Sequence, residues 1–356
     1  MANSASTIAP PPERQSFYDE IFDENLAPLW ESLHQLVPPA PITPVRPVLW
    51  DYDRALRPRL MEAGQLITAR EAERRVLMLQ NPGLNGQAAA TRSIYAGVQL
   101  VLPGEVAPAH RHTQSAIRFI LEGGGYTTVD GEKIQMSPGD FVITPSWTFH
   151  DHGNETDAPL VWVDVLDIPL MSSLDTTFAE AANADAQPVV RPPGDSLARY
   201  GGNMFPVDWK PKTGSSPIFS YPYARSRETL ANLRQYGSPD PCHGYKMRYV
   251  NPANGGYAMP TIGAFMQLLP AGFDAAPYRS TDGTVYVVVE GEGETRFADG
   301  TRIAWKPRDI FVVPSWALHT HHARSEAVLF SASDRPVHEA LGVWREERRA
   351  PEDGEG

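Results

Sequence analysis

Short apolar runs alternate with glycine and proline turns between Arg92 and Leu166. The runs SIYAGVQLVL, SAIRFILE, GYTTV, DFVIT and LVWVDVL are rich in Val, Ile, Tyr and Phe. Runs of this length between turn residues are typical of strands in an antiparallel sandwich or barrel. The same texture returns from Tyr245 to Val343. The pattern therefore predicts a protein dominated by β structure, with two β-rich regions.

The first ninety residues follow a different pattern. Apolar residues recur at near-helical intervals from Phe17 to Val37, which predicts one amphipathic helix that ends before a Pro-Pro pair. The next stretch, PPAPITPVRPVLWDYDRALRP, predicts an extended arm without regular helix, because proline recurs every few residues. Thr68 and Glu71 form a capping box, so AREAERRVLMLQ is expected to form a short helix.

The second β-rich region repeats the first. GDFVITPSWTFHDH (139–152) aligns with RDIFVVPSWALHTH (308–321), and HRHTQSAIRFILEG (110–123) aligns with YRSTDGTVYVVVEG (278–291). This repeat predicts two copies of one β domain. The expected parts of the chain are an N-terminal helix and proline-rich arm (1–90), a first β domain (91–187), a linker (188–244), a second β domain (245–345) and a charged, solvated tail (346–356).

Composition narrows the class of partner. The net charge of -12, from 31 basic and 43 acidic residues, opposes binding to nucleic acid or an anionic membrane. The single cysteine, Cys242, excludes an internal disulfide and a thiolate-rich metal site. The first fifteen residues lack the pattern of a secretory signal, and no eighteen apolar residues run together, so a cytoplasmic location is expected. A small molecule is the expected partner.

Four of the ten histidines lie between Ala109 and Glu155 as two pairs spaced i, i+2. Residues i and i+2 of a strand project from one face, so His110 and His112 can reach the same ion. His150, from another strand, is the candidate third ligand. Three imidazoles leave other coordination positions open for substrate or oxygen.

The second copy is chemically unequal to the first. Tyr278 and Ser280 stand where the first copy has its early histidine pair, whereas His319 and His321 align with the later pair. The second copy is therefore expected to hold no metal, and its histidines are expected to be structural.

The histidine-bearing segments resemble the two motifs of the cupin superfamily. GEVAPAHRHTQSAIRFILEG follows the first motif, with Gly104, His110, His112 and Gly123 in place. GEKIQMSPGDFVITPSWTFHDHGN similarly follows the second motif. The glutamate of the first motif is replaced by Ala116, which leaves a three-histidine site and makes the four-ligand cupins poor parallels.

Over residues 17–345 the chain resembles more narrowly the gentisate 1,2-dioxygenase family of bicupins, which includes salicylate and 1-hydroxy-2-naphthoate dioxygenases. The stretches YAGVQLVLPGE, PSWTFHDHGNE and HGYKMRYVNPANGGYAMPTIGAFMQLLP carry this likeness. It implies two double-stranded β-helix (jelly-roll) barrels with an N-terminal helical segment, and a homotetramer. It further implies Fe(II) held by His110, His112 and His150. With O2, such an enzyme opens an aromatic 2-hydroxy acid between the carboxyl-bearing carbon and the adjacent hydroxyl-bearing carbon.

Gentisate is the leading substrate by this resemblance, since its second hydroxyl, para to the first, helps release electrons from the ring. The alternative is the same reaction on salicylate, a 5-substituted salicylate such as 5-nitrosalicylate, or 1-hydroxy-2-naphthoate. A non-catalytic bicupin that binds a small acid is a more distant alternative. The first copy retains the complete histidine set and the second copy has lost part of it, which favours an enzyme over a binding protein.

Two arginines are candidates for the substrate carboxylate, which a planar guanidinium fork suits. Arg118 follows His112 by an even interval, so a regular strand turns it toward the metal. Arg74 is the second such arginine by resemblance, and its neighbour Arg75 is equally plausible from the sequence. For Arg74 and Arg75, the alternative is a position on a solvated helix face. The resemblance assigns His152 to a hydrogen bond with substrate or bound oxygen, although His321 in the second copy leaves a structural duty open.

Further candidates lie on two apolar strands. Asp164 lies inside VWVDVLD and must be paired, with His152 as the expected partner, and both are candidate catalytic residues. Tyr95, Gly97 and Gln99 alternate along YAGVQ and are expected to share one face of a strand. The resemblance implies that this face lines the substrate pocket, where Gly97 leaves room beside the ring. A strand edge with a packing glycine is the alternative interpretation.

Overall fold

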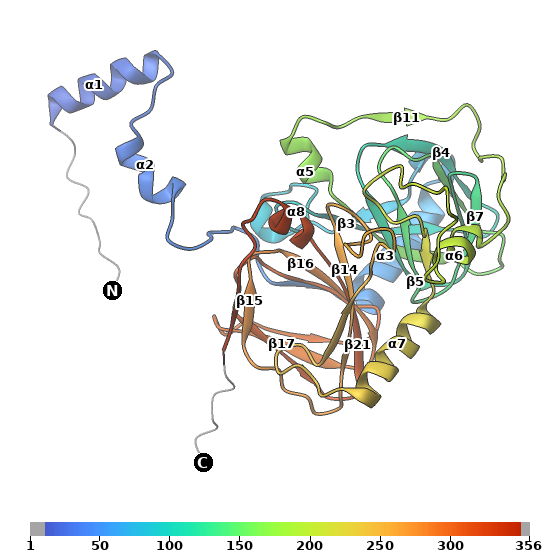
Figure 1. Ribbon diagram of the computed structural model, residues 1–356. Coiled ribbons are helices and arrows are strands. Elements are labelled where there is room, and N and C mark those ends of the chain that lie inside the picture. The colour runs from blue at the N-terminus through green and yellow to red at the C-terminus, as the bar shows by residue number, and fades with distance from the viewer. Residues whose placement is uncertain (1–10, 350–356) are drawn as a thin grey trace. The chain divides into compact units, whose positions relative to one another are not determined.

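Two β barrels form the body of the protein in the computed structural model, which describes residues 11–349 (Figure 1). Contacts divide the chain into two units, Met1–Ile42 and Thr43–Gly356, and both barrels belong to the second unit. Two ranges lie outside the described residues. Residues 1–10 contain most of the segment that was compared with a secretory signal, and residues 350–356 contain most of the expected charged tail.

The N-terminal unit contains two helices where the sequence predicted one. These are α1 (Pro12–Asp23) and α2 (Leu29–Leu36). The expected single helix over 17–37 was wrong. Asn25 adopts a left-handed backbone conformation, with φ 59°, and Pro28 directly precedes α2, so the helical hydrogen-bond ladder stops between them.

The first barrel consists of a six-stranded sheet, in the order β12-β8-β5-β10-β3-β2, and a five-stranded sheet, in the order β11-β4-β9-β6-β7. Each of the five apolar runs named above contains one of its strands, which confirms those predictions. The strands are β2 (Val76–Met78), β3 (Tyr95–Val101), β4 (Val106–His112), β5 (Ala116–Glu122), β6 (Gly125–Val129), β7 (Glu132–Met136), β8 (Phe141–Thr144), β9 (His150–Gly153), β10 (Leu160–Leu166), β11 (Ala179–Ala181) and β12 (Ser220–Tyr221).

The second barrel repeats this strand order as β1-β19-β16-β21-β14-β13 and β18-β17-β20-β15-β22, which confirms the duplication. Its edge strand β1 comes from the N-terminal segment and takes the place that β12 has in the first barrel. The strands are β1 (Val48–Trp50), β13 (Tyr245–Arg248), β14 (Gly263–Leu269), β15 (Tyr278–Ser280), β16 (Thr284–Glu290), β17 (Gly293–Phe297), β18 (Arg302–Trp305), β19 (Ile310–Val313), β20 (His319–Ala323), β21 (Ala327–Ser333) and β22 (Glu346–Arg348).

The proline-rich arm, the start of the tail and several connecting segments contain regular structure that the sequence did not predict. The proline-rich arm carries β1, a π-helical turn (Tyr52–Leu56) and α3 (Arg57–Leu66), because a proline in the first turn of a helix removes no hydrogen bond. The start of the expected solvated tail forms β22, which pairs with β15. Helices elsewhere are α5 (Ile168–Ser173), α6 (Asp195–Tyr200), α7 (Tyr223–Tyr236), α8 (Arg335–Ala340) and the 3-10 turn Pro82–Leu84.

The capping box on Thr68 is confirmed, since its side chain accepts from the Glu71 amide and the Glu71 carboxylate accepts from the Thr68 amide. The helix that it starts, α4 (Ala69–Ala72), is much shorter than expected. Glu73 adopts a positive φ of 51°, which ends the helix, and the following residues form β2.

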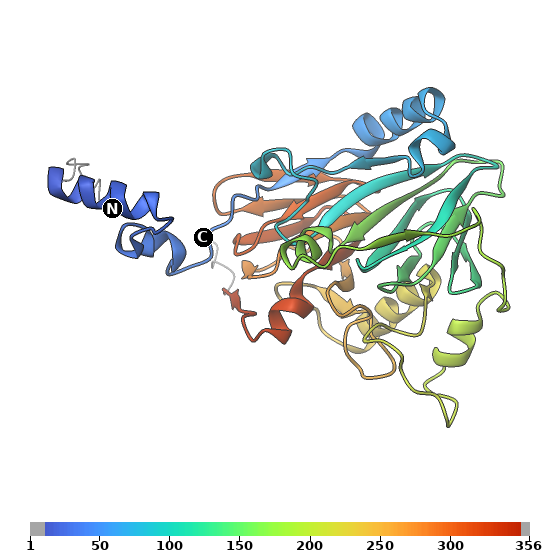
Figure 2. The same cartoon turned by 90° about the horizontal axis from the view of Figure 1, so that it is seen from above.

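The two barrels share one hydrophobic core. Phe119 on β5 stacks on Phe330 on β21 with ring centroids 4.3 Å apart, and Phe141 on β8 lies 5.6 Å from the same ring. Figures 1 and 2 show the green-to-teal strands of the first barrel beside the orange strands of the second. Burying these rings between the sheets fixes the barrels against each other.

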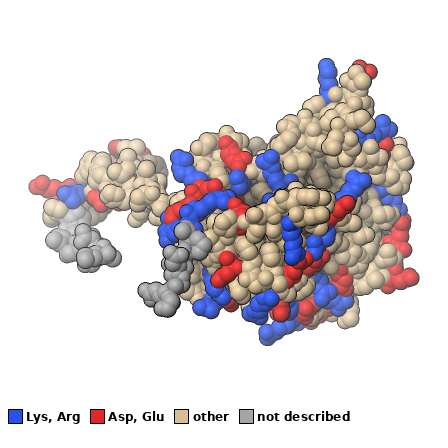
Figure 3. Space-filling view, turned by 60° about the horizontal axis from the view of Figure 1, so that its bottom comes forward, with Lys and Arg blue, Asp and Glu red and all other residues tan. Residues whose placement is uncertain are grey.

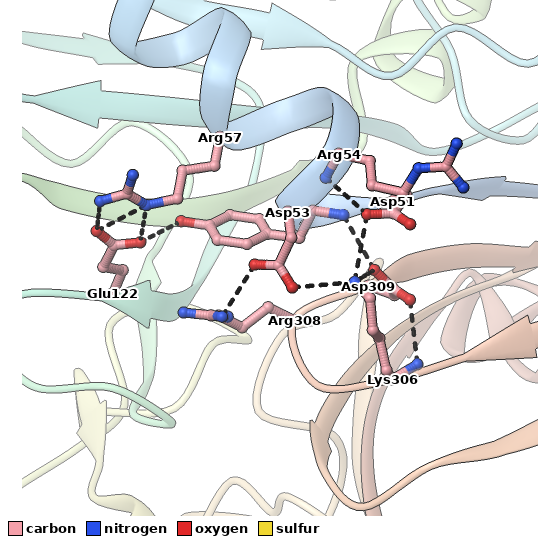
Figure 4. A network of polar contacts seen from close by, with 9 residues as sticks. Asp51, Asp53, Arg54, Arg57, Glu122, Lys306, Arg308 and Asp309 are labelled. Atoms are coloured by element: carbon pink, nitrogen blue, oxygen red, sulfur yellow. Dashed lines mark hydrogen bonds and ion pairs between the residues drawn. The ribbon is translucent and has the colours of Figure 1, made fainter.

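A polar network ties the segment before α3 to both barrels (Figure 4). Arg57 and the hydroxyl of Tyr52 both donate to Glu122 of the first barrel, at 2.7–3.1 and 2.8 Å. The Tyr52 amide donates to Asp309 of the second barrel at 3.0 Å, and Lys306 pairs with Asp53 at 3.0 Å. The N-terminal arm therefore helps to hold the two barrels together.

The charges on the surface are mixed. On the face drawn in Figure 3, Lys and Arg side chains are interspersed with Asp and Glu side chains over the described residues. None of the helices between residues 11 and 349 has the length and apolar character needed to cross a bilayer.

Candidate metal and substrate site

Strands β4 and β9 bring three histidines together inside the first barrel. The two strands pair antiparallel, with His110 opposite His150, and His112 follows at the end of β4. Their ring centroids lie 4.5–5.3 Å apart, and one potential ligand atom from each lies within 4.8 Å of the others. The i, i+2 spacing and the antiparallel register thus place three imidazoles around one point.

The chemistry of these imidazoles fits a metal ion. Nδ1 of His112 lies 2.9 Å from the Gln114 carbonyl, and Nδ1 of His150 lies 2.9 Å from the Thr148 carbonyl. A carbonyl only accepts, so Nδ1 carries the proton in both rings and Nε2 keeps its lone pair. Nε2 of His150 is buried and has no partner among the described residues. Burial lowers the pKa of His110 to about 3 and that of His112 to about 4, so both are neutral near pH 7.

The structure separates Arg74 from Arg75. The guanidinium of Arg75 is held by both oxygens of Glu105, at 2.8 Å each, and by the Ile67 carbonyl. Arg74 instead donates to the Pro108 carbonyl and contacts Nδ1 of His110. Its place is the turn between α4 and β2, not the helix in which the sequence placed it. Arg74 is therefore the arginine beside the histidine cluster.

Arg118 lies at the centre of the inner face, as its even spacing predicted. It is only 3% exposed and is paired across β5 and β10 with Asp164, with Nε 3.3 Å from Oδ1, while its Nη1 donates to the Thr144 hydroxyl. The expected pairing of Asp164 with His152 was wrong, because Arg118 lies directly opposite Asp164 in the sheet register. Burial raises the pKa of Asp164, and the Arg118 charge opposes that rise.

His152 is as fully buried as His150 and lies beside it on β9. Its ring centroid is 5.5 Å from that of His150 and 5.2 Å from the Trp162 indole, and its Nδ1 has no partner in residues 11–349. Burial lowers its pKa well below the usual range, so the ring is neutral and keeps one nitrogen available to accept or donate.

Strand β3 lines the same inner face. Gly97 lies opposite Asp164 and Gln99 opposite Trp162 in the register of β3 and β10, and the amide nitrogen of the Gln99 side chain has no described partner. A Cβ on Gly97 would lie 2.5 Å from the Tyr95 hydroxyl, so a larger residue does not fit without movement there.

Two residues of this site escaped sequence reasoning. Thr144 is fully buried and accepts from Arg118, and Trp162 is fully buried against His152. Trp162 lies two residues before Asp164 in LVWVDVL, so the two-residue period of a strand puts it on the same face as Asp164 and could have identified it.

The second barrel keeps the later histidine pair in a different setting. Nδ1 of His319 lies 2.9 Å from the Ala317 carbonyl, as in its counterpart His150, whereas Nδ1 of His321 lies 2.9 Å from the Thr295 hydroxyl. The Tyr278 hydroxyl, at the position of His110, donates to Glu346 at 3.1 Å.

Acid is expected to destabilise the protein partly through His319. Burial lowers its pKa to about 4, whereas an unfolded histidine titrates near pH ~6.5. As the pH falls from about 6.5 toward 4, the unfolded chain binds a proton that the folded protein refuses, so the free energy of unfolding falls. Urea unfolding of metal-free protein at pH 7 and pH 5 should show a smaller decrease for His319→Gln than for the wild type. An equal decrease in both proteins would contradict this assignment.

Comparison with known proteins agrees with this architecture. The cupin domain family matches residues 97–166 and 264–332. Gentisate 1,2 dioxygenase 1 of Aquipseudomonas alcaligenes is 56% identical over 337 residues, covering 94% of this chain and 96% of that protein. The 5-aminosalicylate 1,2-dioxygenase of Comamonas sp. is 37% identical, covering 94% and 90%. The crystal structure of salicylate 1,2-dioxygenase from Pseudoaminobacter salicylatoxidans with gentisate superposes with a TM-score of 0.91 at 34% identity, over 98% of each chain.

Two cupin barrels and a three-histidine cluster suited to a metal ion define the class of this protein as a bicupin dioxygenase. Within that class, the chain belongs to the gentisate 1,2-dioxygenase family and is a ring-cleaving oxidoreductase.

Proposed function

We propose that this enzyme is an Fe(II)-dependent gentisate 1,2-dioxygenase, with the iron held by His110, His112 and His150. The observation that carries this proposal is the pairing of a neutral three-imidazole cluster with two buried arginines, Arg74 and Arg118. Bound iron would supply the coordination positions and electron transfer that let O2 react with an aromatic ring.

The two arginines suit a substrate carboxylate. Burial, together with the nearby charge of Arg118, lowers the pKa of Arg74 to about 10. Arg118 pairs with Asp164, whereas Arg74 forms no ion pair with a carboxylate among residues 11–349. A substrate carboxylate could meet the Arg74 guanidinium through charge-assisted hydrogen bonds. Asp164 is then a positioning residue, because it acts through Arg118.

The Arg74 guanidinium would become available to the substrate if His110 held iron. An arginine only donates, so its contact with Nδ1 of His110 requires the lone pair of that nitrogen. A histidine that ligates through Nε2 carries its proton on Nδ1, which no longer accepts. The guanidinium would then be free for a substrate oxygen.

His152 and strand β3 would complete the pocket. The neutral His152 ring, with an unpartnered Nδ1, can accept a proton from a substrate hydroxyl or donate one to a developing oxyanion. Tyr95, Gly97 and Gln99 would border the substrate ring, with Gly97 limiting what fits beside it. The Gln99 amide offers a donor that no described residue uses.

The alternative substrates are salicylate, 5-substituted salicylates such as 5-nitrosalicylate, and 1-hydroxy-2-naphthoate. The relatives support these alternative substrates, since proteins 34–37% identical to this chain are named for salicylate and 5-aminosalicylate. The 56% identity to a gentisate enzyme favours gentisate. The non-catalytic small-acid-binding bicupin has no such support.

Oxygen uptake after anaerobic Fe(II) loading tests the function. The panel is gentisate, salicylate, 5-nitrosalicylate and 1-hydroxy-2-naphthoate, and we expect gentisate to give the highest kcat/KM. A ring with a single hydroxyl is less electron-rich, so uptake should be slower. A higher kcat/KM for another acid would replace gentisate as the substrate, and no uptake with any acid would refute the dioxygenase activity.

We also propose that residues 91–187 and 245–345 are the cupin domains and that the enzyme is a homotetramer. Matches to the cupin family within both ranges support the first proposal. Helix α2 supports the second, because it exposes Leu29, Trp30 and Leu36 to 55–66%. Large apolar side chains gathered on one short helix favour burial against another subunit.

A further inference from the structure

The second barrel encloses a cavity of about 230 Å³, although it lacks the early histidine pair. Its wall includes Lys246 on β13, Phe265 on β14 and Tyr286 on β16, with Asp282 in the loop before β16. A dry cavity of about 150 Å³ is already large enough for a benzene ring. The space can therefore hold a single aromatic ring with a small substituent.

Lys246 is the cation of this lining whose ammonium has neither a hydrogen bond nor an ion pair with another residue between 11 and 349. The ammonium lies 5.1 Å from the Phe265 ring centroid and 5.6 Å from that of Tyr286. Burial lowers the pKa of Lys246 to about 8, and the charge of the buried Asp282 opposes that fall, so the ammonium is mostly protonated at pH 7. The aromatic rings stabilise the ammonium without neutralising it, so an anion can still pair with it.

The other charged groups that line the cavity already have partners. Arg335 donates to Glu339 at 2.8 Å, and Arg348 donates to Asp240 at 2.7 Å. The remaining partnerships are Arg248 with the Gly255 carbonyl (3.0 Å), Asp282 with the Trp344 indole (3.0 Å), and Glu346 with the Tyr278 hydroxyl (3.1 Å). Four cations against two carboxylates leave the lining net positive.

The two barrels carry a basic residue at different positions of their inner faces. Lys246 pairs with Gln267 in the sheet register, as Val76 pairs with Gln99 in the first barrel. The position of Arg118 is taken by Tyr286. The second barrel therefore lacks this arginine but carries a lysine on β13, the edge strand of the same sheet.

Three polar atoms beside the cavity also lack partners. Oε1 of Gln267, Oγ of Ser331 and Nε2 of His321 are buried without a partner in the described part of the chain. The register places Gln267 beside Lys246, and Ser331 opposite both Phe265 and Tyr286. These three residues lie outside the cavity lining itself, so their atoms are expected to meet buried water next to the ligand site.

We propose that the cavity of the second barrel binds one small aromatic monocarboxylate, of the benzoate class, with its carboxylate on Lys246 and its ring between Phe265 and Tyr286. This site is separate from the histidine cluster and needs no metal. Lys246 is the one lining cation whose side chain is free of hydrogen bonds and ion pairs within residues 11–349, which suits a monoanion, and the aromatic wall suits a planar ring.

Binding of 4-fluorobenzoate, followed by fluorine NMR on the anaerobic, Fe(II)-loaded, full-length enzyme, tests this site. Lys246→Met is expected to bind one equivalent per chain fewer than the wild type, whereas Lys246→Arg should retain that equivalent. Gentisate turnover and the thermal midpoint of Lys246→Met should stay close to the wild-type values, since Lys246 lies outside the histidine barrel.

Equal stoichiometry and affinity in the wild type and Lys246→Met would overturn the proposal. Displacement of this equivalent by an equal concentration of sulfate would overturn the aromatic class, because the site would then bind any small anion. The measurement involves no turnover, so its result tests the second-barrel site even if the enzyme shows no dioxygenase activity.

Discussion

His112→Ala is expected to lose both bound iron and ring-cleaving activity. His112 supplies one of the three imidazoles that converge inside the first barrel, and its Nδ1 hydrogen bond to the Gln114 carbonyl aims Nε2 at the cluster. Removing a group that merely orients a metal ligand costs roughly 10–100-fold. Removing the ligand itself should therefore lower kcat/KM by more than ~100-fold. Iron per chain, measured after anaerobic loading and desalting, should fall in parallel.

His319→Ala is the matched control. It removes the equivalent of His150 from the second barrel, where the neighbouring position of His110 is Tyr278. Its iron content should equal that of the wild type. Iron and activity retained in His112→Ala, or iron lost in His319→Ala, would contradict the assignment of the metal to the first barrel.

Arg118→Met is expected to produce the largest loss of stability among the site variants. It leaves Asp164, 6% exposed, without the guanidinium 3.3 Å away. Breaking a buried ion pair from one side costs roughly 3–5 kcal/mol, because the remaining charge is uncompensated. Urea unfolding should report a loss of this size, and KM for gentisate should rise because one carboxylate-binding group is gone.

The double variant Arg118→Met with Asp164→Leu separates the two effects. Without either charge, most of the lost free energy of unfolding should return, since an apolar pair can replace a buried ion pair. KM should remain high, because the carboxylate still lacks Arg118. A double variant that recovers stability and a wild-type KM would show that Arg118 does not bind substrate.

Spacing along strands predicted much of the site. The alternation of inner and outer faces placed His110 with His112 and turned Arg118 inward, and both placements depend only on the two-residue period of a strand. Pairing across strands was not predictable in the same way. The sequence paired Asp164 with His152 because a buried carboxylate needs a partner and can orient a histidine, whereas the sheet register puts Arg118 directly opposite.

Local backbone conformation also limited what could be predicted from the sequence. A single residue with positive φ, Glu73, ended the helix α4 and moved Arg74 into a turn beside His110. Such a conformation at a glutamate leaves little trace in the sequence. The choice between Arg74 and Arg75 therefore needed the contacts of each guanidinium, since Glu105, in the turn between β3 and β4, pairs with Arg75.

The sequence by itself determined the duplicated β architecture, the unequal histidine sets of the two copies and the likeness to ring-cleaving bicupins. These features depend on residue type and local spacing, which the chain carries directly. Only the tertiary structure decided which arginine lies at the cluster, which partner Asp164 takes, and that the Lys246 ammonium has no ion-pair partner among residues 11–349 in the second barrel. Each of those depends on strands far apart in the chain, and their register is set by the packing of the whole sheet.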